Sequence, residues 1–351
     1  MLDYFVVGLG LAGISFCEVL EKEGKSFKVV ADSSQQASQV AGGLYNPVIL
    51  KRFTMAWKAK EQLKQAKPFY TGLEQKLGVN LDYPLRVLRK FASVEEQNSW
   101  FEAADRPVLD HFLSTTIVSN QNPSIVAPFD FGEVKYTGRI DTGTLLNAYA
   151  SYLEGKGILN RKTFEFTALV HHNDHVEYQG IKAKQIVFAC GYGLTHDPNF
   201  GYLPLNGTKG ELLIISAPNF KEDSVIKSSV FTIPMGEDKY LVGATYKWHD
   251  KTNLPTEESK NELLEKLATF LKCDFEILDH VAGIRPTVVD RRPLVGRHPV
   301  YQNLYVLNGF GSRGVLIAPY ASRQLYDYIE EGILLDPEID IHRFTKKYYK
   351  N

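Results

Sequence analysis

The first 32 residues contain two short apolar runs with an amphipathic stretch between them. Residues 4–7 and 27–31 are apolar and have the length of strands. Residues 12–23 place apolar side chains on one side of a helix and charged ones on the other. The second apolar run ends at Asp32. The pattern predicts a strand, a helix and a second strand that open an α/β fold.

The turn between the first strand and the helix contains Gly8, Gly10 and Gly13. Gly8 permits a tight turn, Gly10 lets the backbone approach a pyrophosphate, and Gly13 allows the helix to lie close to the strand. The helix N-terminus favours a phosphate at this point. Asp32 can accept hydrogen bonds from the ribose of an adenosine and would repel a 2′-phosphate. A dinucleotide site is therefore predicted, with FAD and NAD as the alternatives.

Periodicity along the rest of the chain predicts further helices and strands. Pro68 is expected to kink or split the first of these helices, and Ser93 followed by Glu96 is a capping pattern for the second. Residues 186–189 are continuously apolar, which indicates a buried parallel strand, and residues 202–247 indicate several alternating strands. Helices are expected at residues 54–77, 94–104, 142–155 and 256–272, and another is expected to open at Ala318 and Pro319.

Composition narrows the class of protein. The chain has 351 residues, 44% hydrophobic and 23% charged, which is typical of a globular protein of about two domains. Its net charge of −1 gives no overall electrostatic signature of nucleic-acid binding. Cys17, Cys190 and Cys273 are widely spaced without a CxxC pair, which predicts reduced thiols in the cytoplasm. The apolar run that starts at Leu2 is soon broken by glycines, so neither a signal peptide nor a membrane span is expected.

Two further segments are rich in small residues. Residues 33–50 read SSQQASQVAGGLYNPVIL, and small side chains there let the backbone pack against a large flat ligand. Residues 283–319 contain GIRP, then DRRPLVG, then the turn GFGSRG followed by an Ala-Pro pair. Together with the N-terminal GLGLAG, these segments resemble the D-amino-acid oxidase superfamily of flavoproteins, which includes glycine oxidase and sarcosine oxidase. The resemblance covers the whole chain, in the family's order.

The resemblance implies non-covalently bound FAD and a Rossmann-like α/β domain into which a β-rich substrate domain of α+β type is inserted discontinuously. The FAD-binding domain is expected at residues 1–80, 140–205 and 281–351, and the substrate domain at 81–139 and 206–280. In the family, the second glycine turn places N–H groups near the flavin pyrimidine, where negative charge appears on reduction. The expected cofactor-binding residues are Gly8, Gly10, Leu11, Ala12, Gly13, Asp32, Ser38, Ala41, Gly42, Gly43, Leu44, Val170, Ala189, Cys190, Gly191, Gly311, Ser312, Arg313, Gly314 and Val315.

Arg285, in the GIRP segment, is predicted to bind the substrate carboxylate, because the guanidinium fork matches a carboxylate. Its position matches an arginine that binds the substrate in glycine-oxidase-like proteins. The alternative is a structural arginine tied to Asp279 or Asp290. Arg313 follows the family's active-site arginine position by one residue, where this chain has Ser312. Its predicted direction therefore stays open between substrate, flavin and solvent.

The resemblance implies oxidation of the C–N bond of a small carboxylate-bearing amine or amino acid by hydride transfer to flavin N5. Oxygen or another acceptor then takes the electrons. Positioning and electrostatics do most of this work, so the catalytic candidates are Arg285, Arg313 and Tyr246.

Two other functions are considered. The AGGLYNP and GSRG segments also resemble the FAD domain of a bacterial bifunctional enzyme that removes a carboxymethyl group from a wobble uridine of tRNA. A flavoprotein with only a binding role is the third hypothesis. His171, His172 and His175 flank an Asn-Asp turn, which predicts an exposed hairpin and no metal site. The sequence leaves the amine, the electron acceptor and the oligomeric state open.

Overall fold

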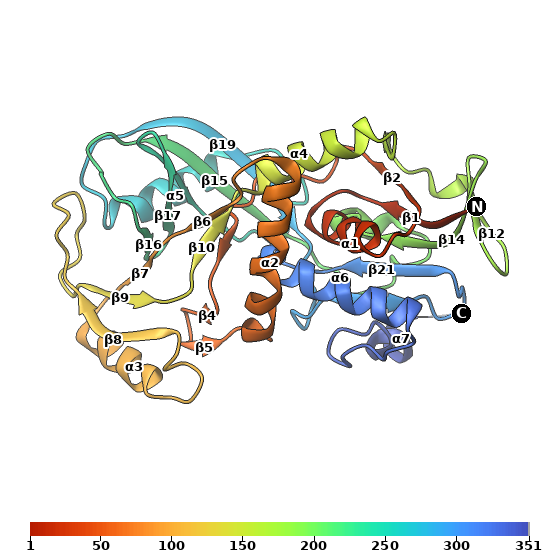
Figure 1. Cartoon of the computed structure of the whole chain (residues 1–351). Helices are drawn as coiled ribbons and strands as arrows, with labels where there is room; N and C mark the ends of the chain where they lie inside the picture. The colour runs from red at the N-terminus through yellow and green to blue at the C-terminus, as the bar shows by residue number, and fades with distance from the viewer. Residues whose placement is uncertain (350–351) are drawn as a thin grey trace.

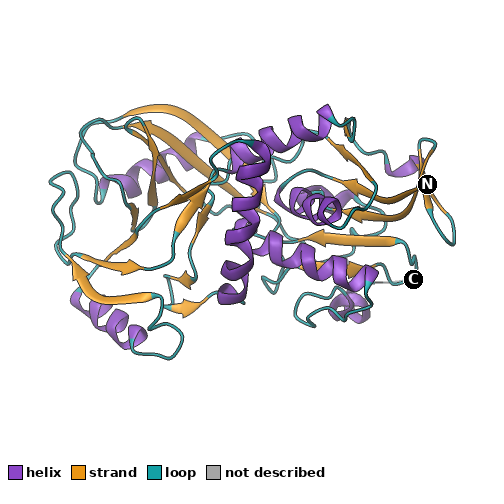
Figure 2. Cartoon of the chain, viewed as in Figure 1, coloured by secondary structure: helices purple, strands orange, loops and turns teal. Residues whose placement is uncertain are grey.

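Residues 1–349 are described by a computed structural model, in which two large sheets lie side by side (Figure 1). A mostly parallel sheet lies near both chain termini, on the right of Figure 1, and a mostly antiparallel sheet lies on the left. Helix α2 (Ala59–Leu77) stands between them, and Figure 2 shows further helices against both sheets. The predicted α/β fold with a β-rich second part is confirmed.

The parallel sheet is centred on β1 (Leu2–Val7), which pairs in parallel with β2 (Phe27–Ala31) and β14 (Ile181–Phe188). β14 also pairs in parallel with β21 (Leu304–Asn308). β1, β2, β21 and the second half of β14 are mostly buried, which is why these segments appear in the sequence as nearly continuous apolar runs. The sheet is completed by β11 (Leu159–Arg161), β12 (Leu169–His171), β13 (Val176–Tyr178) and β20 (Leu294–Arg297).

Both faces of the parallel sheet carry a hydrophobic core. On one face α1 (Leu11–Lys22) packs against α6 (Gly314–Glu330), together with residues of α2 and α4 (Thr142–Gly155). The other face packs against aromatic side chains of the segments that connect the strands and against α7 (His342–Tyr348). The helix that follows β1 is therefore held on the sheet with its N-terminus at the end of the strand.

Two helices have the predicted bounds, one of them from its capping pattern. α3 (Val94–Ala104) begins after Ser93, whose hydroxyl oxygen accepts a hydrogen bond from the Glu96 N–H at 3.3 Å. α4 covers the predicted residues 142–155. α5 (Glu257–Ala268) ends four residues before its predicted end, because the chain beyond Ala268 continues in tighter turns in which residue i+3 bonds to residue i.

The prediction for residues 54–77 is wrong in two respects. Thr54–Met55 is a short strand (β5) that pairs with β4 (Val48–Ile49), and the helix begins only at Ala59. The helix also continues through Pro68 without a break. Pro68 and Lys64 are both exposed, so water can satisfy the carbonyl that a proline leaves without an N–H donor.

The last long helix begins at Gly314, four residues before the predicted start. Pro319 was predicted to open the helix, whereas it lies inside the helix. A proline there removes the N–H that would bond to the carbonyl of Val315. The Tyr70 hydroxyl from α2 donates to that carbonyl instead, at 2.7 Å, so the cost of the proline is offset by a tertiary contact. Among the helices of residues 1–349, none is long and apolar enough to cross a bilayer.

The second sheet contains eight strands in the order β19-β15-β18-β17-β16-β7-β9-β8. Their bounds are β7 (Val87–Lys90), β8 (Leu113–Val118), β9 (Phe131–Val134), β15 (Thr208–Ser216), β16 (Val225–Lys227), β17 (Phe231–Gly236), β18 (Lys239–Gly243) and β19 (Glu276–Arg285). A small sheet of β3 (Leu44–Tyr45), β6 (Asp82–Pro84) and β10 (Gly138–Ile140) lies apart from it. β19 stays in the second sheet as far as Arg285, beyond the expected boundary at residue 281. The domain boundaries themselves remain predictions.

Candidate functional site

A cavity of about 1910 Å³ is lined by residues of both large sheets. A drug-sized ligand needs roughly 300–1,000 Å³, so this volume suits a dinucleotide together with a second small molecule. Among the predicted site residues, Gly13 and Val170 do not line the cavity and all the others do. The chain therefore brings the N-terminal turn, the 33–50 loop, the end of β14 and the C-terminal turn to one place.

The N-terminal turn requires glycine for steric reasons. Gly8 has a φ of +97°, and a side-chain carbon there would lie 2.6 Å from the carbonyl oxygen of Ala189, the residue that follows β14. A side-chain carbon at Gly13 would lie closer than 3.0 Å to the carbonyl of Gly8, which agrees with the packing role predicted for it. Gly10 is the N-cap residue of α1, and it has no side chain that could cap this helix. This helix N-terminus faces the cavity and fits a phosphate group.

Asp32 lies at the end of β2, on the cavity wall. Its carboxylate accepts hydrogen bonds from the hydroxyl and the N–H of Ser34, at 2.6 and 3.0 Å. Burial acts to raise the pKa of Asp32, but these hydrogen bonds outweigh burial and lower the pKa below its usual value. Asp32 is thus a carboxylate at neutral pH, and it can accept from ribose hydroxyls.

The 33–50 loop passes between the two sheets. A side-chain carbon at Gly42 would lie 2.9 Å from Ile233 of β17, and one at Gly43, where φ is +66°, would overlap the carbonyl of Ile140. The Ser38 hydroxyl accepts a hydrogen bond from the Leu11 N–H at 3.2 Å, which ties the loop to the start of α1. At these two glycines the loop is therefore packed too closely against its neighbours to accept a side chain.

The C-terminal turn meets the N-terminal turn. A side-chain carbon at Gly314 would lie 2.9 Å from the Leu11 side chain, so the first turns of α6 and α1 are in contact. Arg313 donates a hydrogen bond to the backbone carbonyl of Asn46 at 2.8 Å. Burial lowers the pKa of Arg313 to about 10, which leaves it charged at neutral pH. Arg313 thus bonds to the 33–50 loop at the cavity wall rather than pointing to solvent, and its contact with substrate or flavin stays a prediction.

Arg285 lies at the end of β19 on the cavity wall. Its guanidinium stacks on the ring of Tyr246 at 4.5 Å and donates to the carbonyl of Thr245 at 3.2 Å. Burial lowers its pKa. Asp290 pairs with Arg343 instead, and within residues 1–349 Arg285 forms no ion pair with any carboxylate. The alternative of a structural arginine tied to Asp279 or Asp290 is therefore wrong.

Val170 lies outside the cavity. It is on β12, pairs with Glu177 and is 50% exposed, so its predicted contact with the cofactor has no geometric support. Phe164 and Phe166 line the cavity in its place. The segment before the hairpin strand, rather than the strand itself, turns toward the cavity. Cys190 lines the cavity, and burial raises the pKa of its thiol, as expected for an unreactive cysteine.

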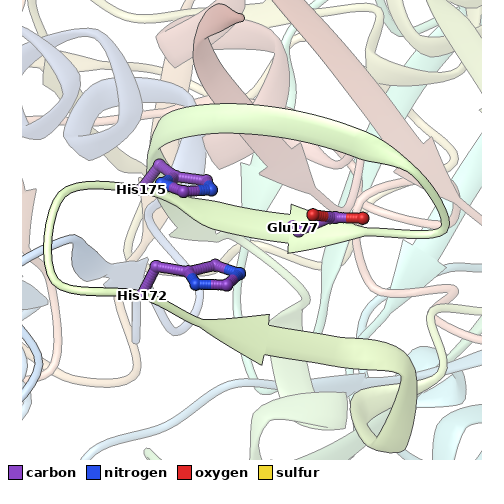
Figure 3. Close-up of side chains that lie close together, drawn as sticks. All are labelled: His172, His175 and Glu177. Atoms are coloured by element: carbon purple, nitrogen blue, oxygen red, sulfur yellow. The ribbon is translucent and has the colours of Figure 1, made fainter.

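The three histidines lie on the predicted hairpin, formed by β12 and β13. His172, His175 and Glu177 offer ligand atoms within 4.8 Å of one another (Figure 3). The two imidazole rings stack at 4.3 Å with an angle of 9° between their planes. His172 is exposed, and none of the three residues belongs to the cavity wall. The cluster is separate from the candidate site.

Lys227, Phe231 and Arg89 also line the cavity, and sequence analysis missed them. They come from β16, β17 and β7 of the second sheet. A single lysine within a short apolar strand matches no pattern of binding residues. Only the register of the strands shows that these side chains share a face.

The whole chain is similar to known flavoproteins. The family described as FAD dependent oxidoreductase matches residues 3–328. The glycine oxidase of Pseudomonas aeruginosa is 23% identical over 353 residues, which cover 95% of this chain and 96% of that protein. The tRNA 5-methylaminomethyl-2-thiouridine biosynthesis bifunctional protein of Legionella pneumophila is 25% identical over 205 residues, or 48% of this chain and 30% of that protein.

Solved structures share the fold at low identity. The glycine oxidase of Bacillus cereus superposes with a TM-score of 0.76 at 21% identity, covering 95% of this chain and 96% of that one. The iminodiacetate oxidase of a Chelativorans species also has a TM-score of 0.76, at 16% identity, with 97% and 98% covered. The match over residues 3–328, together with the two glycine turns that meet at one cavity, shows that this chain belongs to the D-amino-acid oxidase family of FAD-dependent oxidoreductases, with FAD as its cofactor.

Proposed function

We propose that this FAD-dependent oxidoreductase oxidises the C–N bond of a small amine or amino acid that carries a carboxylate, and that Arg285 binds this carboxylate. The observation that carries the proposal is a partly buried guanidinium in the cavity whose hydrogen-bond partner is a neutral carbonyl. Desolvation of a cation is unfavourable unless an anion compensates it. A substrate carboxylate supplies that anion and matches the planar fork of the arginine.

In the proposed reaction the substrate loses two electrons and two protons as the C–N single bond becomes an imine, and water then hydrolyses the imine to a carbonyl compound and an amine. When bound, FAD supplies the two-electron acceptor. Tyr246 holds the Arg285 guanidinium by stacking, and the nearby cation Arg313 helps to keep the substrate amine neutral, because positive charges disfavour the ammonium form. A neutral amine has the lone pair that this oxidation requires.

The cofactor contacts follow from the cavity wall. Gly8, Gly10 and the N-terminus of α1 suit the diphosphate, and Asp32 suits the ribose of the adenosine. The loop with Gly42 and Gly43 and the turn from Gly311 to Val315 offer backbone groups to the remainder of the FAD. We expect the FAD to be held without a covalent bond.

Oxidation of a carboxymethyl-aminomethyl group on tRNA is the second candidate. The partial match to the Legionella pneumophila protein supports it, and so do three exposed cations, Lys51, Arg52 and Arg291, on the cavity wall. In the described part of the chain none of the three forms an ion pair, so they are available to phosphates. Arg285 would bind the carboxymethyl group in this reaction as well.

The test is anaerobic bleaching of the flavin absorbance in the purified holoenzyme. The panel contains D-amino acids, N-methyl amino acids and tRNA that carries the carboxymethyl-aminomethyl uridine. We expect at least one carboxylate-bearing amine to bleach the flavin and Arg285→Leu to lose that response while retaining FAD. Arg106→Leu is the matched control, because Arg106 is exposed and lies outside the cavity wall. Normal kinetics in Arg285→Leu would remove Arg285 from the site.

A further inference from the structure

A row of paired residues crosses the cavity side of the second sheet. Lys227 on β16 pairs with Arg89 on β7 and with Phe231 on β17. Phe231 pairs in turn with Gly243, and Gly243 with Leu212. Residues that pair directly across strands project from the same face of a sheet. Arg89, Lys227, Phe231 and Leu212 all line the cavity, so this row forms one of its walls.

The two cations of this row differ in their partners. Arg89 donates to the Glu96 carboxylate at 2.7 and 2.9 Å and to the carbonyl of Ser228 at 3.2 Å. Its charge is therefore compensated within the chain. Lys227 has its ammonium over the ring of Phe231, at 4.8 Å from the centroid, and across residues 1–349 it forms no ion pair with a carboxylate. Burial, followed by the charges of Arg89 and Arg285, lowers the pKa of Lys227 to about 8.

Lys227 shares the cavity with Arg285. Both side chains line the cavity from the second sheet, Lys227 from the end of β16 and Arg285 from the end of β19. A side-chain carbon at Gly42 would touch the ring of Phe231 at 3.9 Å, so the ring beneath the ammonium packs beside the loop proposed to contact FAD. Lys227 and Arg285 are thus two cations on the second-sheet side of the cavity for which residues 1–349 supply no anion. A substrate with a single carboxylate would compensate only one of them.

We propose that Lys227 binds a second anionic group of the substrate, so that the substrate is an amine bearing two carboxylates, such as an N-carboxymethyl amino acid or an acidic amino acid. This inference rests on the proposed amine oxidation and names its substrate class. Arg285 binds one carboxylate, Lys227 binds the other, and the C–N bond to be oxidised lies between them. Arg89 is a positioning residue, because it holds the backbone next to Lys227 through the carbonyl of Ser228.

The experiment compares matched substrates in the holoenzyme. Iminodiacetate and sarcosine are both N-substituted glycines with a secondary amine, and they differ by one carboxylate. D-aspartate and D-alanine also differ by one carboxylate. The rate of anaerobic flavin bleaching is measured as a function of substrate concentration for the wild type, Lys227→Met, Lys227→Arg and Lys90→Met. Lys90 is next to Arg89 on β7 and lies outside the cavity wall, so Lys90→Met is a matched loss of charge.

We expect the wild type to prefer the dianionic member of a pair by at least tenfold in kcat/KM. Lys227→Met should lose this preference, whereas Lys227→Arg and Lys90→Met should keep it. The preference should also be present below pH 8 and decline above it, because kcat/KM reports the charge of Lys227 in the free enzyme.

Four other results would contradict the inference. Equal use of both members of each pair by the wild type, or an unchanged preference in Lys227→Met, overturns the second carboxylate and leaves the proposed amine oxidation in place. Loss of FAD from Lys227→Met would assign the lysine to the cofactor and also overturns the inference. If no amine bleaches the wild-type flavin, the proposed function fails, and this inference fails with it.

Discussion

The substitution Gly210→Ala tests whether the position of the Arg285 guanidinium matters for binding of the substrate carboxylate. Gly210 lies on β15 and pairs with Gly283 of β19. A side-chain carbon at residue 210 would lie closer than 3.0 Å to three atoms of the Arg285 guanidinium. Real side-chain carbons do not approach other atoms so closely, so the guanidinium has to leave its place. The absence of a side chain at Gly210 is therefore what allows Arg285 to lie across β15.

The displacement breaks the contacts that orient Arg285. The guanidinium loses the 3.2 Å hydrogen bond to Thr245 and the stacking on Tyr246 at 4.5 Å. A hydrogen bond to a charged group contributes about 1.5–3 kcal/mol, and each 1.4 kcal/mol corresponds to about a factor of ten in rate or affinity. If the misplaced guanidinium no longer meets the carboxylate, kcat/KM should fall by roughly 10- to 150-fold.

The assay measures kcat/KM for the amine that bleaches the wild-type flavin most efficiently, along with FAD content and the thermal midpoint. Gly155→Ala is the control, since Gly155 ends α4 and a side-chain carbon there meets nothing within 4 Å. It should be neutral or slightly stabilising. A Gly210→Ala protein with full FAD content and kcat/KM within twofold of the wild type would refute the reasoning.

Three further substitutions test the fold around the site. Gly8→Ala should yield protein without bound FAD, measured as the flavin absorbance per chain, because the added carbon would lie 2.6 Å from the Ala189 carbonyl at a φ of +97°. Tyr70→Phe should lower the free energy of unfolding by about 1–2 kcal/mol in urea titration, because the buried Val315 carbonyl loses its donor. Burial raises the pKa of Asp197 to about 6, so the folded state holds this proton more tightly than the unfolded state and stability falls as pH rises from about 4 to about 6. Asp197→Asn should remove this decline, a difference of about 2 kcal/mol between urea titrations at pH 4 and pH 7.

Local patterns explain which parts of the fold were predictable. The strand, glycine turn and helix at the N-terminus depend on contacts between neighbouring segments, and so does the cap at Ser93. The errors at Pro68 and Pro319 have a different origin. Each proline removes a backbone donor, and whether the helix breaks depends on what replaces that donor: solvent in the first case, a tyrosine from another helix in the second. The local sequence does not contain that information.

The same limit applies to the candidate site. The position of Arg285 on the cavity wall was predictable, because Arg285 belongs to the GIRP segment that resembles a family motif. Lys227 belongs to none, and its relation to Arg285 exists only through the register of β16, β17 and neighbouring strands. Val170 is the opposite case, because it was expected to contact the cofactor. It is half exposed on β12, and residues of the preceding segment line the cavity.

Two fully buried charged residues elsewhere in the second sheet have partners within the chain. Lys209 is fully buried, and its ammonium bonds to the carboxylate of Asp250 at 2.5 Å. Glu211 is also fully buried, and its carboxylate accepts from the N–H of Thr256 at 2.7 Å. The sheet thus supplies partners for charges that serve the structure, as the cost of desolvation requires. Lys227 and Arg285 lie on the cavity wall of the same sheet and have no such partner in the described chain. This contrast is the reason why we propose that a bound molecule supplies their counter-charges.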